Sequence, residues 1–276
     1  MAEVYRYWDE CRGNIRTKKG GWVIGKGVYI SGHSLLDDLI GKASYFQSLI
    51  LNITGELPSA EVARWVEALY QCMSFPDSRL WCNQVGTLGG MLRVPSASGI
   101  TAGILASDSR MYGPGTIPLT YSFLVNGLEE YGEGEEVSKI IRKWVANNRK
   151  KVVIPGYGRP LATGDERVVA MEKISEELGM VSGPCLEFAY AVERYMLETQ
   201  GESMNLSAYG TATMIDIGWS SSHIQQVYAI VAVSGIAACY SEAYDNPPES
   251  FLPLRCEDIE YRGHAPRPVP GVGEEG

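Results

Sequence analysis

Residues 85–106 read VGTLGGMLRVPSASGITAGILA, and this stretch contributes most to the choice of fold. It is rich in glycine, alanine and serine, and such small side chains let two helices approach each other closely. Pro95 interrupts the stretch, because proline lacks an N–H and clashes with the preceding turn of a helix. We therefore predict a tightly packed central helical segment that is interrupted at Pro95.

Helical patterns also precede this segment. Apolar residues between 62 and 73 recur on one helix face; they are Val62, Trp65, Val66, Leu69, Tyr70 and Met73. Residues 44–54 predict a helix that stops at Gly55, and Ser34 to Asp37 fit a capping box that opens a short helix. Residues 20–31, GGWVIGKGVYIS, place β-branched and aromatic residues around Gly-Lys-Gly, which predicts a small hairpin.

Helical patterns continue after the break at Gly113-Pro114-Gly115. The predicted helices there cover residues 137–145, 165–179, 184–199 and about 221–243. The last of them is apolar nearly all round, so we expect it to be buried between other elements. Residues 264–276 are rich in proline and glycine and are expected to be extended or disordered. The fold class is therefore all-α, with at most a small N-terminal β-hairpin.

Composition narrows the kind of partner. The 276 residues carry 45% apolar and 21% charged side chains, as an ordinary globular protein does. The net charge of −9 matches neither nucleic acid nor an anionic membrane, both of which attract basic surfaces. We therefore expect neither nucleic acid nor a membrane as a partner. One basic cluster, formed by Arg142, Lys143 and residues 149–151, is either a solvated helix face or a phosphate or CoA contact.

Cysteine usage and the N-terminus indicate a reduced setting. The six cysteines occur singly, without CxxC pairs or nearby histidines, so we expect no disulfide framework and no metal site. The N-terminal residues MAEVYRYWDE lack a basic region followed by an apolar run, so no signal peptide is predicted. A cytoplasmic location is the expectation.

Four segments, in this order, resemble motifs of citrate synthase and its relatives. GHSLLDDL at 32–39 with GELP at 55–58 resembles the N-terminal "RGYxIxxL … GELP" motif, and RVPSASG at 93–99 resembles "RxxASTG". PGYGR at 155–159 with DER at 165–167 resembles "PGFGHRV … DPR", and the run 205–216 is similar to "NVDG" and its helix. The short length is nearest the stand-alone citryl-CoA lyases.

The resemblance implies a citrate-synthase-like homodimer. Its large helical domain would comprise residues 1–112 and 217–276, and its small helical domain residues 113–216. It also implies a CoA thioester as substrate, with no tightly bound cofactor. The CoA would be held around the PGYG turn by Val153, Ile154, Pro155, Gly156, Tyr157 and Gly158. Glycines expose backbone N–H and C=O groups that can hydrogen-bond adenine; alternatively, the turn merely joins two helices.

The family's reaction makes or breaks a C–C bond beside a thioester, using a carboxylate base and two histidines. By position, none of the three histidines of this chain (His33, His223 and His264) falls on a catalytic site. Arg159 stands where a histidine follows the PGYG motif. A guanidinium can polarise a carbonyl or grip a carboxylate, but it cannot accept a proton at neutral pH.

Three further catalytic positions differ from the family. Tyr112 stands where the lyases have a histidine before a glycine pair, although an alternative register places Thr116 there. Ser207 replaces the aspartate base, and a serine hydroxyl is no base. In a looser alignment, Asn83 takes the place of another histidine. We assign Arg159, Tyr112, Ser207 and Asn83 to the catalytic set.

The substrate-binding set is incomplete. Arg167 in Asp-Glu-Arg matches an arginine that binds a substrate carboxylate, and Arg255 is a second candidate. Ala232 and Cys239 stand where a further arginine and a histidine are expected. The resemblance thus implies a lyase, synthase or decarboxylase of an acyl-CoA or related carbonyl substrate with a non-standard site. The alternatives are a degenerate CoA-binding or regulatory homologue and a recruited enzyme with a non-CoA substrate.

Overall fold

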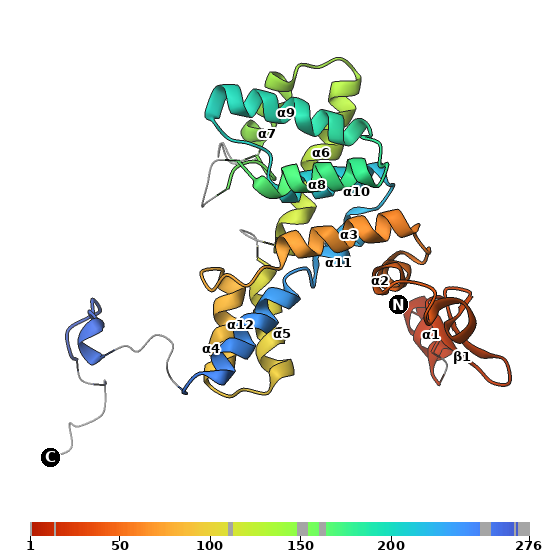
Figure 1. Ribbon diagram of the computed structural model, residues 1–276, viewed down its shortest axis with the longest axis horizontal. Helices are drawn as coiled ribbons and strands as arrows, with labels where there is room; N and C mark the ends of the chain where they lie inside the picture. Colours follow the sequence, from red (N-terminus) through yellow and green to blue (C-terminus); the bar gives the residue numbers. More distant parts are fainter. Residues whose placement is uncertain are drawn as a thin grey trace.

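The structure, a computed structural model, describes residues 2–13, 15–109, 113–147, 154–159, 164–248, 255–267 and 269. It is mostly helical (Figure 1), so the predicted fold class is confirmed. The α-helices are α1 (Ala2–Cys11), α2 (Tyr45–Thr54), α3 (Ala60–Met73), α4 (Trp81–Met91), α5 (Ser96–Ser107), α6 (Ile117–Gly132), α7 (Val137–Asn147), α8 (Glu166–Glu177), α9 (Pro184–Gln200), α10 (Leu206–Asp216), α11 (Ser221–Tyr228) and α12 (Val233–Asp245). The π-helix η1 covers Leu35–Leu39, and the 3-10 helices η2 and η3 cover Gly113–Thr116 and Cys256–Asp258.

The predicted hairpin is present in a three-stranded antiparallel sheet. Strand β1 (Gly20–Val23) pairs with β2 (Gly27–Ile30), and Gly20 lies opposite Ile30. Strand β3 (His33–Ser34) adds to the other edge of β2. Ser34 Oγ then accepts a hydrogen bond of 3.1 Å from Asp37 N and opens η1. The sequence patterns did not predict helix α1.

The helices predicted before the central segment are confirmed. Ser44 Oγ accepts a hydrogen bond from Gln47 N, and Gln47 Oε1 accepts one from Ser44 N, so a full capping box opens α2. Gly55 ends this helix in the left-handed region, at φ +90°. In α3, Trp65 and Leu69 are fully buried, as the apolar periodicity predicted.

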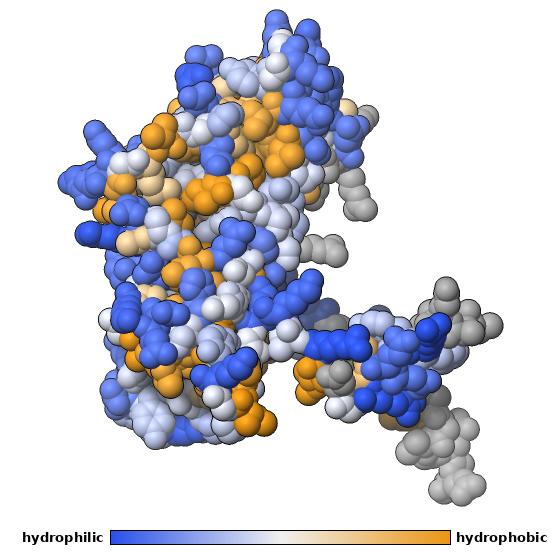
Figure 2. Space-filling model, turned by 90° about the vertical axis from the view of Figure 1, so that its right-hand side faces the viewer, coloured by the Kyte–Doolittle hydropathy of each residue, from blue (hydrophilic) through white to orange (hydrophobic). Residues whose placement is uncertain are grey.

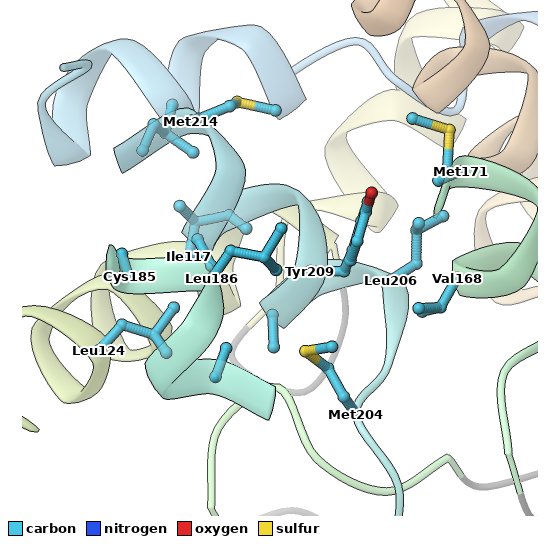
Figure 3. Packing of buried hydrophobic residues seen from close by; sticks show 14 of the residues in the cluster. Ile117, Leu124, Val168, Met171, Cys185, Leu186, Met204, Leu206, Tyr209 and Met214 are labelled. Atoms are coloured by element: carbon cyan, nitrogen blue, oxygen red, sulfur yellow. The ribbon is translucent and has the colours of Figure 1, made fainter. Parts of the chain in front are cut away.

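The main core lies among α3, α6, α8, α9, α10 and α11. Figure 3 shows Leu206 and Tyr209 of α10 between Leu186 of α9 and Val168 and Met171 of α8. Helix α6 was not predicted, although it contributes the buried side chains of Phe123 and Leu124. The core therefore draws on residues from both predicted domains, and the division at 112/113 and 216/217 stays a prediction.

A second, smaller core forms where α4, α5 and α12 meet at the other end of the molecule (Figure 1). A methyl group on Gly90 of α4 would lie 2.2 Å from Tyr240 O of α12. One on Gly103 of α5 would lie 2.5 Å from the Ile236 side chain. Small residues thus let these helices touch closely, and the break at Pro95, which is the N-cap residue of α5, confirms the predicted central segment.

The prediction of one long helix over 221–243 was wrong. The chain forms α11, turns through residues 229–232 with bonds such as Val231 N to Tyr228 O at 3.1 Å, and then begins α12. The physical reason is that the two halves serve different cores: Tyr228 is buried in the main core and Ile236 in the second. Residues 221–245 are long and apolar enough by composition to cross a membrane, but half of their most apolar 18-residue window is buried inside the protein, as in the core of a folded domain.

We expect Gly90→Ala to lower the free energy of unfolding by about 1–3 kcal/mol, because the added methyl group meets the rigid backbone of α12. The control is Gly132→Ala at the end of α6, where no atom lies within 4 Å of the added carbon. That change should leave stability unchanged or raise it by about 0.5–1 kcal/mol. Urea unfolding of both variants provides the measurement, and equal effects would contradict the close helix contact.

Candidate functional site

The PGYG turn is fastened to the beginning of α10. Gly158 N donates to Ser203 O at 2.8 Å, and Asn205 N donates to Gly156 O at 2.9 Å. The Asn205 side chain adds a bond from Nδ2 to Gly158 O at 2.9 Å, while its Oδ1 accepts from Ser207 N at 3.0 Å. Asn205 therefore caps α10 and holds the turn at the same time.

Glycine is required in this turn for conformation and for space. Gly156 and Gly158 have φ values of +86° and +87°, where other residues are strained. A methyl group on Gly156 would also lie 2.4 Å from Ala208 Cβ. The side chains of Ile154 and Tyr157 are buried. A ligand at this turn would therefore contact Pro155 and the glycine backbone; Val153 lies outside the described residues.

Two arginines meet at one buried carboxylate beside the turn. Arg167 Nε and Nη2 bind Asp165 Oδ1 and Oδ2, each at 2.7 Å, and the Asp165 side chain is only 1% exposed. Asp165 Oδ2 also accepts from Leu206 N at 2.9 Å, at the beginning of α10. Arg159 Nη1 lies 3.7 Å from Asp165 Oδ1 and 2.5 Å from Glu166 Oε2. The structure thus brings together two of the predicted residues, Arg159 and Arg167.

Both carboxylates of this cluster are held ionised. Burial raises the pKa of Asp165. The hydrogen bonds and charge of Arg167, together with the backbone N–H groups of Leu206 and Arg167, lower this pKa by more than burial raises it, so the net shift is downward. The pKa of Glu166 is lowered chiefly by its hydrogen bond from Arg159. At neutral pH, Asp165 serves as an anchor for Arg167 rather than as a free base.

Ser207 lies in the first turn of α10, and its Oγ is buried without a hydrogen-bond partner among the described residues. Thr211 Oγ1, one turn further along α10, and Tyr228 Oη on α11 are also buried, and these two hydroxyls lie beside each other. The sequence analysis named Ser207 but missed Thr211, Tyr228 and the anchoring role of Asp165. Asp165 was visible in the DER motif, whereas no sequence pattern showed that the other two hydroxyls are buried.

The remaining candidates lie elsewhere or are engaged. Thr116 Oγ1 donates to Gly113 O at 2.8 Å. Thr116 lies one helical turn before Thr120, and the methyl group of Thr120 packs near Gly156. The Asn83 amide donates both hydrogens, to Phe75 O and Asp77 O, and so holds the loop before α4.

Two other candidates are not placed at this cluster. Arg255 is exposed in the C-terminal segment, which stands apart from the helical body (Figures 1 and 2). Tyr112 and residues 149–151 lie outside the described residues.

Two cavities in the described part of the chain do not include the arginine cluster. One, of about 350 Å³, lies between the α4–α5 turn and α12, beside Arg93 and Tyr240. The other, of about 230 Å³, lies between α8, α9 and α10, beside Ser175 and Tyr209. The chemistry of the buried ion pair and the buried Ser207 hydroxyl, rather than cavity volume, marks the candidate site.

We expect Asn205→Ala to cost about 1–2 kcal/mol of unfolding free energy, because the change removes the cap of α10 and the bond to Gly158 O. Asn205→Asp keeps the capping oxygen but loses the N–H donor, so it should retain most of the stability while loosening the turn. Urea unfolding measures the first effect and amide hydrogen exchange at Gly158 the second. Equal protection of Gly158 in the Asn205→Asp variant and the wild type would contradict the role of the side chain.

Comparisons with known proteins point to one family. The family model described as "Citrate synthase, C-terminal domain" matches residues 96–250. Among solved structures, citryl-CoA lyase from Hydrogenobacter thermophilus is similar, with 25% identity, a TM-score of 0.78, and coverage of 93% of this chain and 98% of that one. A search of curated protein sequences gave no significant match.

Two more distant structures share the fold. ATP citrate lyase from Methanosaeta concilii, solved with (3S)-citryl-CoA, is 14% identical with a TM-score of 0.74. The match covers 96% of this chain but only 44% of that protein. Citrate synthase from Thermoplasma acidophilum is 17% identical, with a TM-score of 0.61 and coverage of 84% and 60%. The predicted citrate-synthase-like fold is therefore confirmed.

Proposed function

The chain belongs to the family of the citrate synthase C-terminal domain, and from this premise we propose that it makes or breaks a C–C bond, or decarboxylates, on an acyl-CoA or related carbonyl substrate. The observation that carries the proposal is the meeting of Arg159 and Arg167 at the buried Asp165, directly beside the PGYG turn and the beginning of α10. We further propose a cytoplasmic setting, a small-molecule substrate and no tightly bound cofactor.

Arg159 is suited to exchange its partner for a substrate. Its guanidinium contacts Glu166, whose side chain is 73% exposed, and an ion pair with so exposed a partner contributes little stability. A substrate carboxylate or thioester oxygen can therefore replace Glu166 at small cost. Arg167 stays fixed by Asp165, which orients its guanidinium for a second anionic group.

This arrangement favours chemistry that needs no strong base. Arg159 remains protonated, Asp165 is fully engaged, and the hydroxyl of Ser207 does not accept a proton at neutral pH. What the residues supply is positive charge and hydrogen-bond donors for a developing enolate or carboxylate. Decarboxylation or cleavage of an activated β-carbonyl compound suits such a site better than α-proton abstraction.

The test is to incubate the purified protein with acetyl-CoA plus oxaloacetate, with citryl-CoA and with a β-ketoacyl-CoA, and to follow thioester consumption and carbonyl products. Turnover of at least one ester supports the proposal. If CoA esters bind in calorimetry but none reacts, the protein is a binding or regulatory homologue. If no CoA ester binds or raises the melting temperature, the proposal is wrong, and an enzyme with a non-CoA substrate is the favoured alternative.

We also propose that the protein acts as a homodimer through α5. The outer face of α5 is exposed along its length and consists mostly of small residues: Ala97, Ser98, Thr101, Ala102 and the larger Leu105. Leu105 is 71% exposed, although α5 is among the most apolar helices of the chain. A second copy that covers this face would remove the exposed surface from water.

Leu105→Glu is expected to shift the protein from dimer to monomer, because the change buries an unpaired charge in the contact. Sedimentation velocity measures the molecular mass. The matched control is Val181→Glu, which changes another highly exposed apolar residue in the turn between α8 and α9 and should leave the mass unchanged. A wild-type monomer, or a dimer that persists in the Leu105→Glu variant, would contradict the proposed interface.

A further inference from the structure

Strand β1 leaves one edge of the small sheet open. The strand order is β1-β2-β3, so β1 pairs with β2 on one side, and no strand of the described residues lies on its other side. All four residues of β1 are exposed; Trp22 in the strand is 74% exposed and Ile24, directly after it, 85%. Folded proteins usually cover or blunt such an edge, because its unpaired N–H and C=O groups are a template for another strand.

The segment around this edge is basic, although the whole chain carries a net charge of −9. Residues 12–26 contain five basic side chains and no acidic one. Three of the five, Arg16, Lys18 and Lys26, make no ion pair with any residue that the structure describes. The open edge therefore favours an acidic partner, because complementary charges steer association and fix its register.

The C-terminal segment at residues 257–262 has the complementary properties. Its sequence, EDIEYR, contains three acidic side chains. Charged and apolar residues alternate from Asp258 to Arg262, which is the pattern of a strand with one apolar face. The two apolar residues, Ile259 and Tyr261, are 68% and 77% exposed. Residues 259–262 lie in neither a helix nor a strand, so their backbone is available for pairing.

The arrangement of the molecule indicates that the two elements meet between copies. In Figure 1 the C-terminal segment follows the far end of α12, on the opposite side of the molecule from β1. A second copy brings the same segment to β1 without having to cross the helical body. In a two-fold dimer each copy then gives one segment and receives one, and both exposed apolar faces are removed from water.

We propose that residues 257–262 of one protomer add a strand to the open edge of β1 in a second protomer. The apolar face of the segment lies against Trp22, and its acidic side chains lie toward Lys18 and Lys26. Main-chain hydrogen bonds supply the attachment, and the charges select the partner. The inference rests on the proposed homodimer and adds the segments that the two copies exchange.

The test is a disulfide between two chains. Side chains alternate along a strand, so Gly21 and Glu260 lie on the faces that Trp22 and Tyr261 leave free. One protein carries Gly21→Cys, where no atom lies within 4 Å of the added carbon, and the other carries Glu260→Cys. Both also carry serine in place of the cysteines of the two terminal regions, Cys11 and Cys256. After subunit exchange and mild oxidation, non-reducing electrophoresis should show a covalent dimer, and mass spectrometry should identify the peptide pair 21–260.

The matched control pairs the Glu260→Cys protein with one that carries Val181→Cys, a change at a 91% exposed position in the turn between α8 and α9. The Val181 pair should form its disulfide about tenfold more slowly or less, because nothing holds the two thiols together. Adding Lys18→Glu and Lys26→Glu to the Gly21→Cys protein should slow the specific disulfide about threefold or more at low salt.

Three results would overturn the inference. The first is the absence of the 21–260 disulfide, and the second is an equal rate in the Val181 control, which would mean random collision. The third is a single chain with both Gly21→Cys and Glu260→Cys that closes its disulfide within itself. Sedimentation of the Leu105→Glu variant tests the α5 contact separately, so failure of that interface and failure of the strand exchange are distinguished.

Discussion

Asp165→Ala is expected to lower the free energy of unfolding by about 3–5 kcal/mol, because it leaves the partly buried Arg167 without its counter-charge. The lost interactions are two bonds of 2.7 Å from the guanidinium and the bond from Leu206 N. Urea unfolding at neutral pH measures the effect. Glu166→Gln, which changes the exposed carboxylate one residue later, is the control and should cost less than about 1 kcal/mol.

The pH dependence of the free energy of unfolding, compared between the wild type and the Asp165→Ala variant, gives a second measurement. The folded-state pKa of Asp165 lies below its ordinary value of 3.8, so the unfolded chain binds a proton more readily than the folded chain. The stabilisation that ionised Asp165 contributes is therefore fully present above pH 3.8, and it is lost as the pH falls through the lower folded-state pKa. The difference between the wild type and the Asp165→Ala variant should shrink in that acidic range. A difference that is small at pH 7, or constant down to acid, would contradict the anchoring role.

Arg159→Ala should lower kcat for the reactive CoA ester by about 100-fold or more, because a fixed donor to the developing negative charge is lost. Affinity for CoA itself should stay roughly intact, since the turn is held by Ser203 and Asn205 and not by Arg159. Steady-state kinetics and calorimetry with CoA separate the two effects. Arg159→Lys keeps the charge but not the forked geometry, so it should recover only part of the rate.

Arg64→Ala provides the control for a general loss of positive charge, because Arg64 is exposed on α3 and lies outside both the arginine cluster and the basic cluster around Arg142. This variant should match the wild type in kcat. If Arg159→Ala keeps full activity, Arg159 is not part of the reacting site. An equal loss in both variants would assign the effect to electrostatic attraction of the substrate at long range.

The fold was largely readable from the sequence, since its strongest signals are local. Capping by Ser34 and the glycine stop at Gly55 act within a few residues, and both are found as predicted. The apolar stripe of α3 needs only its own periodicity. The break between Tyr228 and Val233 escaped prediction because it depends on two separate cores, which a run of apolar residues does not reveal.

The candidate site was only partly readable. Motif order singled out Arg159 and Arg167 as site residues, and the structure brings both to one carboxylate beside the PGYG turn. The motif could not show that the Asn83 side-chain amide donates both hydrogens to backbone carbonyl groups of residues 75 and 77. It also could not reveal that the hydroxyls of Thr211 and Tyr228 are buried side by side between α10 and α11.

The span of the main core along the chain has a consequence for biosynthesis. Trp65 on α3 and Tyr228 on α11 belong to the same buried cluster, although more than half of the sequence separates them. A nascent chain that has left the ribosome only as far as α10 still lacks the α11 side chains that close this core. We expect stable folding to wait until α11 has been synthesised, because contacts between distant residues form late. Chains truncated before residue 221 should accordingly be degraded or aggregate.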